Sequence, residues 1–142
     1  MLELVAAIAI TGAVLVTTLT LTREGMELCR KADLADVMTL LATSRMEQES
    51  ARAAVDFLTL DESGTFAAEG YPLVRWHAVH SDQSADGGIT DRLMAISLTV
   101  WDDADNNGSL DATEPSTSFH TKVANMSDYQ NELVRILQLL GL

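Results

Sequence analysis

The sequence predicts an α+β fold in which one long N-terminal helix packs on a small antiparallel β-sheet. Three observations predict it. Leu4–Thr22 is uncharged and mostly apolar, helical spacing of apolar residues continues to about residue 58, and after Gly64 that spacing changes to two. The expected parts are a transmembrane or filament-core half of the helix at 1–22, an amphipathic half at 23–58, and a globular β-rich part at 59–142.

The apolar run is long enough to cross a bilayer. As a helix, Leu4–Thr22 would span roughly 28 Å, about the thickness of the hydrocarbon core. A secretory signal peptide is the alternative, but only three residues precede the run and none is basic. Basic residues follow the run and none precedes it, which would place the C-terminal side in the cytoplasm. A basic leader before Met1 would reverse that orientation.

The helical pattern continues beyond the apolar run, with no proline before Pro72. One helix from about residue 2 to 58 would be roughly 85 Å long, so its N-terminal half is expected to project as a stalk, with a bend near Gly12 or Gly25. Cys29 is expected to pack as a small apolar side chain. The predicted apolar stripe is Leu28, Ala32, Ala35, Val37, Leu40, Leu41, Ser44, Met46, Ala51, Ala54, Val55 and Leu58. The predicted polar faces carry Glu27, Arg30, Lys31, Asp33, Arg45, Glu49 and Arg52.

The second half of the sequence predicts three strands and a final helix. Residues 74–79, 93–101 and 117–123 alternate with a period of two. For the first strand, the sequence does not decide which face is buried, because either Val74, Trp76 and Ala78 or the alternate residues can face the core. Residues 81–90 read as a loop, and a capping box at Ser127–Gln130 predicts a helix over 127–140. The residues predicted to share a face of their strand are Met94, Ile96, Leu98 and Val100, and then Phe119, Thr121 and Val123.

Residues 103–114 match the twelve-residue calcium loop of EF-hands. Gly108 permits the sharp turn, Leu110 is expected to point to the core, and Glu114 to bind the ion through both oxygens. Because strands flank the loop and Pro115 follows it, the loop is expected on a hairpin rather than between helices. A merely acidic turn is the alternative. The predicted calcium ligands are Asp103, Asp105, Asn107, Ser109 through its carbonyl, Asp111 and Glu114.

Composition and motifs argue against other classes of protein. The net charge of −12 argues against direct binding to nucleic acid, because an acidic surface repels phosphates. His77 and His80 would lie on opposite faces of a strand and so do not predict a metal site. No nucleophile elbow or glycine-rich phosphate loop occurs, so the sequence predicts no enzyme.

The first ten residues, Met1–Ile10, resemble the start of a mature type IV pilin or pseudopilin, and Glu3 matches the glutamate that this family carries there. The order of segments along the chain is similar to that of the minor pseudopilin I and PilV-like group. The segments that carry this likeness are Leu40–Ala42, Arg45–Glu47, Val74–Trp76 and Val100–Trp101. The resemblance also implies a leader and two further residues before Met1, either left out by the assigned start or removed from the chain.

This resemblance implies a pilin-like fold and a minor subunit of a type II secretion pseudopilus or type IV pilus, assembling at the filament tip. It implies a single pass through the inner membrane, a globular domain in the periplasm or on an extracellular filament, and other minor and major subunits as partners. Glu3 would act in assembly, paired with the N-terminal amine of a neighbouring subunit. The alternative is a membrane-anchored calcium-binding sensor or adhesion domain.

Overall fold

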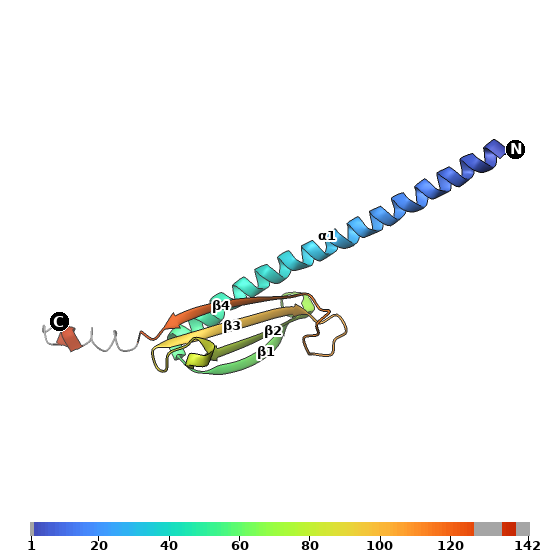
Figure 1. The fold of residues 1–142 in the computed structure, drawn as a ribbon. Helices are drawn as coiled ribbons and strands as arrows, with labels where there is room; N and C mark the ends of the chain where they lie inside the picture. Colours follow the sequence, from blue (N-terminus) through green and yellow to red (C-terminus); the bar gives the residue numbers. More distant parts are fainter. Residues whose placement is uncertain (1, 127–134, 139–142) are drawn as a thin grey trace. The chain divides into compact units, whose positions relative to one another are not determined.

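The computed structural model describes residues 2–126 and 135–138. Figure 1 shows one helix followed by a four-stranded antiparallel sheet, which confirms the predicted α+β class. The elements are α1 (Leu2–Asp56), β1 (Leu60–Phe66), β2 (Tyr71–Ser81), a 3-10 turn η1 (Ser84–Asp86), β3 (Leu93–Asp102) and β4 (Ser116–Ala124). Most of the predicted helix at 127–140 lies outside the described residues, and residues 135–138 are helical.

The chain divides into two units, residues 1–37 and 38–142. The described residues of the first unit, 2–37, all belong to α1, and the helix continues without interruption through Gly12 and Gly25. Its threonines donate their hydroxyls to the carbonyl four residues earlier, as Thr11 does to Ala7 at 2.8 Å and Thr18 to Val14 at 2.8 Å. These bonds satisfy polar groups within the helix itself, which an apolar surrounding requires.

The second unit contains the C-terminal part of α1 and the whole sheet, with strand order β1-β2-β3-β4. α1 ends at Asp56, two residues earlier than predicted, and Phe57 follows in the left-handed region (φ 42°) with its N–H bonded to the Ala53 carbonyl at 3.0 Å. The three predicted strands are confirmed and extend slightly further than expected as β2, β3 and β4.

Strand β1 was not predicted, because its sequence LDESGTF is poor in the residues that favour strands. Pairing with β2 and an ion pair between Arg52 of α1 and Glu62 at 2.8 Å hold it at the sheet edge. Gly64 lies against the ring of Trp76, where an added Cβ would come within 2.7 Å of the indole. A glycine that looks like a turn residue is therefore required for packing on a neighbouring aromatic ring.

The core lies between α1 and one face of the sheet. Val74, Trp76 and Ala78 are buried, which settles the face that the sequence left open for β2. The alternation predicted for β3 is confirmed, and in β4 the side chains of Phe119, Thr121 and Val123 are partly buried together. The buried apolar residues are Met38, Ala42, Ala53, Phe66, Val74, Trp76, Ala78, Met94, Ile96, Leu98, Val100 and Trp101.

The predicted apolar stripe of α1 is wrong for its C-terminal part. Leu40 and Val55 are 71% and 84% exposed, whereas Glu49, predicted to face solvent, is 2% exposed. Small side chains at Ala42 and Ala53 let the helix approach the sheet, and Glu49 finds polar partners there. Cys29 is likewise exposed rather than packed. A count of apolar residues per helical face cannot foresee these compensations.

Candidate metal site and the polar cluster beneath the helix

The acidic loop at 103–114 connects β3 to β4, so its predicted position on a hairpin is confirmed. The Asp102 N–H donates to the Pro115 carbonyl at 3.1 Å and closes the base of the loop. Within the loop, Asn106 (φ 57°) and Gly108 (φ 82°) adopt left-handed backbone conformations. Asparagine and glycine accept that conformation readily, which is why this sequence can turn so sharply here.

Asp103 is the anchor of the loop, and its side chain is fully buried. Its carboxylate accepts hydrogen bonds from the backbone N–H groups of Asn107 (2.9 Å) and Gly108 (3.0 Å) and pairs with the guanidinium of Arg75. Burial alone would raise the pKa of Asp103, but these bonds from Gly108, Arg75 and Asn107 outweigh it and lower the pKa below its usual value. Asp103 is therefore held as a carboxylate.

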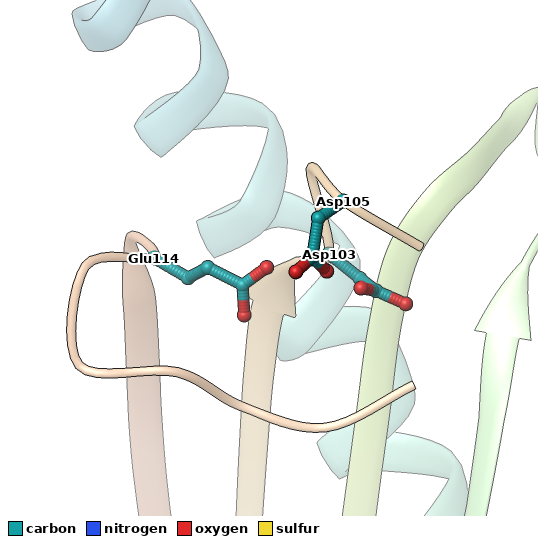
Figure 2. A group of neighbouring side chains, drawn as sticks. All are labelled: Asp103, Asp105 and Glu114. Atoms are coloured by element: carbon teal, nitrogen blue, oxygen red, sulfur yellow. The ribbon is translucent and has the colours of Figure 1, made fainter. Parts of the chain in front are cut away.

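Three carboxylates converge at this point, as Figure 2 shows for Asp103, Asp105 and Glu114. One oxygen from each lies within 4.8 Å of the others. Glu114 also closes the loop, because its two oxygens accept the N–H groups of Ala104 (3.1 Å) and Asp111 (3.0 Å). Oxygens that surround one calcium ion at about 2.3–2.6 Å lie at comparable separations from one another. The cluster can therefore hold a metal ion.

The other predicted ligands lie beside this cluster. The amide nitrogen of Asn107 donates to Asp105 and to Asp111, each at 2.9 Å, while its oxygen accepts the Ser109 N–H at 2.6 Å. A half-turn of this amide would direct its oxygen toward the carboxylates instead. Leu110 is 44% exposed, so the prediction that it points to the core is wrong.

Arg75 is the residue at this site that the sequence did not identify. It lies on β2, opposite Trp101 of β3, and also donates to the Asn106 side chain at 3.1 Å. A Cβ at Gly108 would come within 3.6 Å of its guanidinium, so the arginine lies under the turn. The available signal was the alternation of β2, but the register with β3 that brings Arg75 to the loop is not readable from the sequence.

A cluster of polar side chains lies between α1 and the sheet. Glu49 and His80 are both buried, and the Glu49 carboxylate lies 3.2 Å from His80 Nε2 and 2.6 Å from the guanidinium of Arg45. Arg45 in turn stacks 3.8 Å above the ring of Trp76. Burial lowers the pKa of His80, an effect that the nearby Glu49 only partly offsets. His77, on the opposite face of β2, pairs instead with Asp61 at 2.7 Å.

Glu3 lies in the first turn of α1 and is exposed. Among the residues that the structure describes, no cationic side chain lies within ion-pairing distance of it. α1 is long and apolar enough to cross a membrane, none of its apolar window is buried, and a signal sequence has the same properties. Glu3 therefore begins a helix whose apolar surface finds no cover among the described residues of its own chain.

Comparison with known proteins identified no relative of this chain. No family model matches the sequence, and no curated protein or solved structure is significantly similar to it. The fold itself, a long apolar N-terminal helix packed on a four-stranded antiparallel sheet, is a pilin-like architecture.

Proposed function

We propose that this protein is a subunit of a membrane-anchored filament of the pilin or pseudopilin kind, and that it performs no reaction of its own. The observation that carries the proposal is the uncharged run Leu4–Thr22, which is continuous with the helix of the globular unit. None of its described side chains is buried. The large apolar residues whose side chains the structure describes are more than half exposed, namely Leu4, Ile8, Ile10, Val14, Leu15, Val16, Leu19 and Leu21.

Such a surface needs cover from outside the chain. Burying one large aliphatic side chain contributes about 1.5–3 kcal/mol, so leaving eight of them in water is strongly unfavourable. A bilayer supplies this cover before assembly, and the helices of neighbouring subunits would supply it in a filament. The threonine hydroxyls of the run are already bonded within the helix, for example Thr20 to Val16 at 2.9 Å. The run therefore suits both surroundings.

Glu3 is the residue through which we propose that assembly is selected. A carboxylate next to hydrocarbon is costly unless it is paired, and the helix that carries Glu3 supplies no cation within its first two turns. The N-terminal amine of an adjacent subunit would supply the missing charge. The most specific form of the proposal is a minor subunit at the filament tip, anchored in the inner membrane, with other minor and major subunits as partners.

The test is incorporation of Glu3→Ala into filaments in the protein's own cells, measured by cross-linking to co-assembled subunits. We expect normal insertion into the membrane but at least a severalfold loss of cross-linked product. Glu24→Ala, at an exposed acidic position on the same helix, is the matched control and should assemble normally. Equal incorporation of both variants would refute a role for Glu3 in assembly.

We also propose calcium as the ion held by the hairpin loop. Hard carboxylate oxygens are the ligands that calcium prefers, and Asp103, Asp105 and Glu114 already face one point. Asp111 and Asn107 would complete the shell after the amide turns, with the Ser109 carbonyl beside them. Bound calcium would neutralise the repulsion among the acids and stabilise the hairpin that joins β3 to β4. Magnesium would do less, because it demands a smaller octahedral shell.

Melting of the protein in calcium and in chelator tests this site. If calcium is present at 100 times its dissociation constant, it adds about 2.7 kcal/mol to the unfolding free energy. We expect Glu114→Ala to abolish the shift and Glu69→Ala, an exposed acid outside the loop, to retain it. Equal melting temperatures in calcium and chelator would refute the site. A shift that survives Glu114→Ala would place the ion elsewhere.

The acidic cluster also favours a second function, a membrane-anchored calcium sensor or adhesion domain. The two functions differ in their assembly. A protein that remains monomeric in its membrane and changes conformation with calcium would favour the sensor, whereas cross-linking to co-assembled subunits at any calcium concentration would favour the filament.

A further inference from the structure

A cavity of about 460 Å³ lies on the face of the sheet that does not pack on α1. This volume is within the range of sites that bind small molecules, roughly 300–1,000 Å³. The floor includes Val79 of β2 and Ala95 and Ser97 of β3, and one wall includes His120 and Lys122 of β4. The opposite wall is the connection between β2 and β3, which contributes Asp86. The cavity is separate from the acidic loop and from the polar cluster beneath the helix.

The strand register explains why the cavity forms there. Val79 lies opposite Ser97, which lies opposite His120 on the next strand. In the neighbouring row, Ala95 lies opposite Lys122. Short side chains on the central strands are thus followed by long polar ones on the edge strand. This step in side-chain length leaves space above the middle of the sheet.

The wall opposite β4 is fixed in place by hydrogen bonds. The Ser81 hydroxyl donates to the Asp86 carboxylate at 2.6 Å, and the Gly88 N–H donates to the Gln83 carbonyl at 2.9 Å. Gly87 adopts a left-handed conformation (φ 86°), and a Cβ at Gly88 would come within 2.5 Å of the Asp82 backbone. The connection is therefore a compact turn with its shape set by glycine, so the cavity is largely formed in advance of any ligand.

The charges around the cavity are uneven. Lys122 lies against Gly87, where an added Cβ would be 3.2 Å from its Nζ. Within the described part of the chain, no carboxylate lies within ion-pairing distance of this ammonium. Asp86 also faces the cavity, but the Ser81 hydroxyl is already bonded to one of its oxygens. In a chain of net charge −12, an unpaired lysine beside an apolar floor is a local site for a negative group.

We propose that this cavity binds a small organic anion, with an apolar body over Val79 and Ala95 and a carboxylate or phosphate bonded to Lys122 and His120. Charge-assisted hydrogen bonds from the ammonium would orient the anionic group. The Asp86 carboxylate opposes the ligand's charge and limits its affinity. The site does not depend on the filament function, since none of its residues lies on α1.

Benzoate and phenyl phosphate serve as the probes, because each joins a flat apolar ring to one of the two anionic groups. The full-length protein is titrated in micelles of a non-ionic detergent, and the amide signals of Gly87 and Lys122 are followed by NMR. We expect saturable shifts with at least one probe, centred on the cavity, and no saturable shift with neutral benzamide. The two anionic arms then show whether a carboxylate or a phosphate is preferred.

Two substitutions should change the affinity in opposite directions. Lys122→Gln should weaken binding about tenfold because it removes the charged donor. Asp86→Asn should strengthen binding about twofold to fivefold because it removes a like charge while leaving an oxygen for Ser81. Arg92→Gln, an exposed residue outside the cavity, changes the net charge equally and should leave the affinity unchanged. Ser97→Leu should fill the cavity and abolish the shifts.

Opposite effects of Lys122→Gln and Asp86→Asn establish the site, since a general loss of folding cannot strengthen binding. Three results would overturn the proposal. They are shifts that never saturate with either anion, an affinity that Lys122→Gln leaves unchanged, and equal binding of benzamide.

Discussion

The two parts of α1, residues 2–37 and residues 38–56, differ in whether their apolar side chains are buried within the chain. In residues 2–37, no described side chain is buried although the segment is mostly apolar. In residues 38–56, the side chains of Met38, Ala42 and Ala53 are buried, and the buried face also includes a glutamate, Glu49, at 2% exposure. The most hydrophobic part of this chain is therefore not its core. We propose that the uncharged run at its N-terminal end packs in an apolar surrounding outside the chain, whereas the C-terminal segment packs on the sheet.

Glu49 shows how a charged side chain of the C-terminal segment is accommodated in the core of the sheet domain. The carboxylate is tolerated in the core because Arg45 and His80 approach it from two sides, and Arg45 is itself placed over Trp76. The uncharged run Leu4–Thr22 needs no such partners, because its threonine hydroxyls, such as those of Thr11 and Thr18, are bonded to its own backbone. Polar groups of the N-terminal run form hydrogen bonds within the helix, whereas the buried carboxylate of the C-terminal segment depends on tertiary contacts.

Removing residues 1–22 should have the largest effect. We expect the full chain to require detergent and the shortened chain to be soluble and folded, because none of the described side chains among the deleted residues is buried. The measurement is the distribution between membrane and soluble fractions, together with a cooperative melting curve of the shortened chain. A full chain that is soluble and monomeric in plain buffer would contradict the proposed membrane anchor.

Glu49→Ala should destabilise the sheet domain by about 3 kcal/mol, because Arg45 then loses its buried counter-charge and His80 loses its polar neighbour. The matched control is Glu47→Ala, an exposed position on the same helix, which should change stability by less than about 0.5 kcal/mol. Chemical unfolding of both variants in the same detergent gives the comparison. Equal unfolding midpoints would mean that the cluster does not contribute to stability.

Acidification should have a smaller effect, through His80. Its pKa is lowered in the folded protein, chiefly by burial, so the folded state binds its proton less readily than the unfolded state does. The contribution of neutral His80 to the unfolding free energy is therefore fully present above pH 6.5, the usual pKa of histidine. This contribution decreases as the pH drops below 6.5, by at most about 1.4 kcal/mol per pH unit. The groups that face His80 are Glu49 and Arg52 on α1 and Glu62 on β1.

Melting temperatures between pH 8 and pH 5 measure this slope. His80→Gln should flatten it, even if the variant is less stable throughout. An unchanged slope in His80→Gln would assign the pH dependence to another group.

Much of this fold could be predicted from the sequence, because apolar spacing marks α1, β2, β3 and β4 clearly. Strand β1 could not, since Gly64 is selected by the ring of Trp76 on the neighbouring strand rather than by strand preference. The acidic loop was recognisable because its candidate ligands are close in sequence. Arg75, which lies twenty-eight positions before Asp103 and is paired with it, was not, because that contact depends on the strand register.

The most direct test of the central claim compares the two segments of α1 within one membrane. Cys29 is the sole cysteine, so Cys29→Ser provides a cysteine-free background for Ile10→Cys and Val55→Cys. Both positions are exposed in the isolated chain, at 67% and 84%. With a membrane-impermeant maleimide on opened cells, we predict rapid labelling of Val55→Cys and protection of Ile10→Cys until the membrane is dissolved in denaturant. Equal labelling of both in intact membranes would contradict the claim that the uncharged run Leu4–Thr22 is covered from outside the chain.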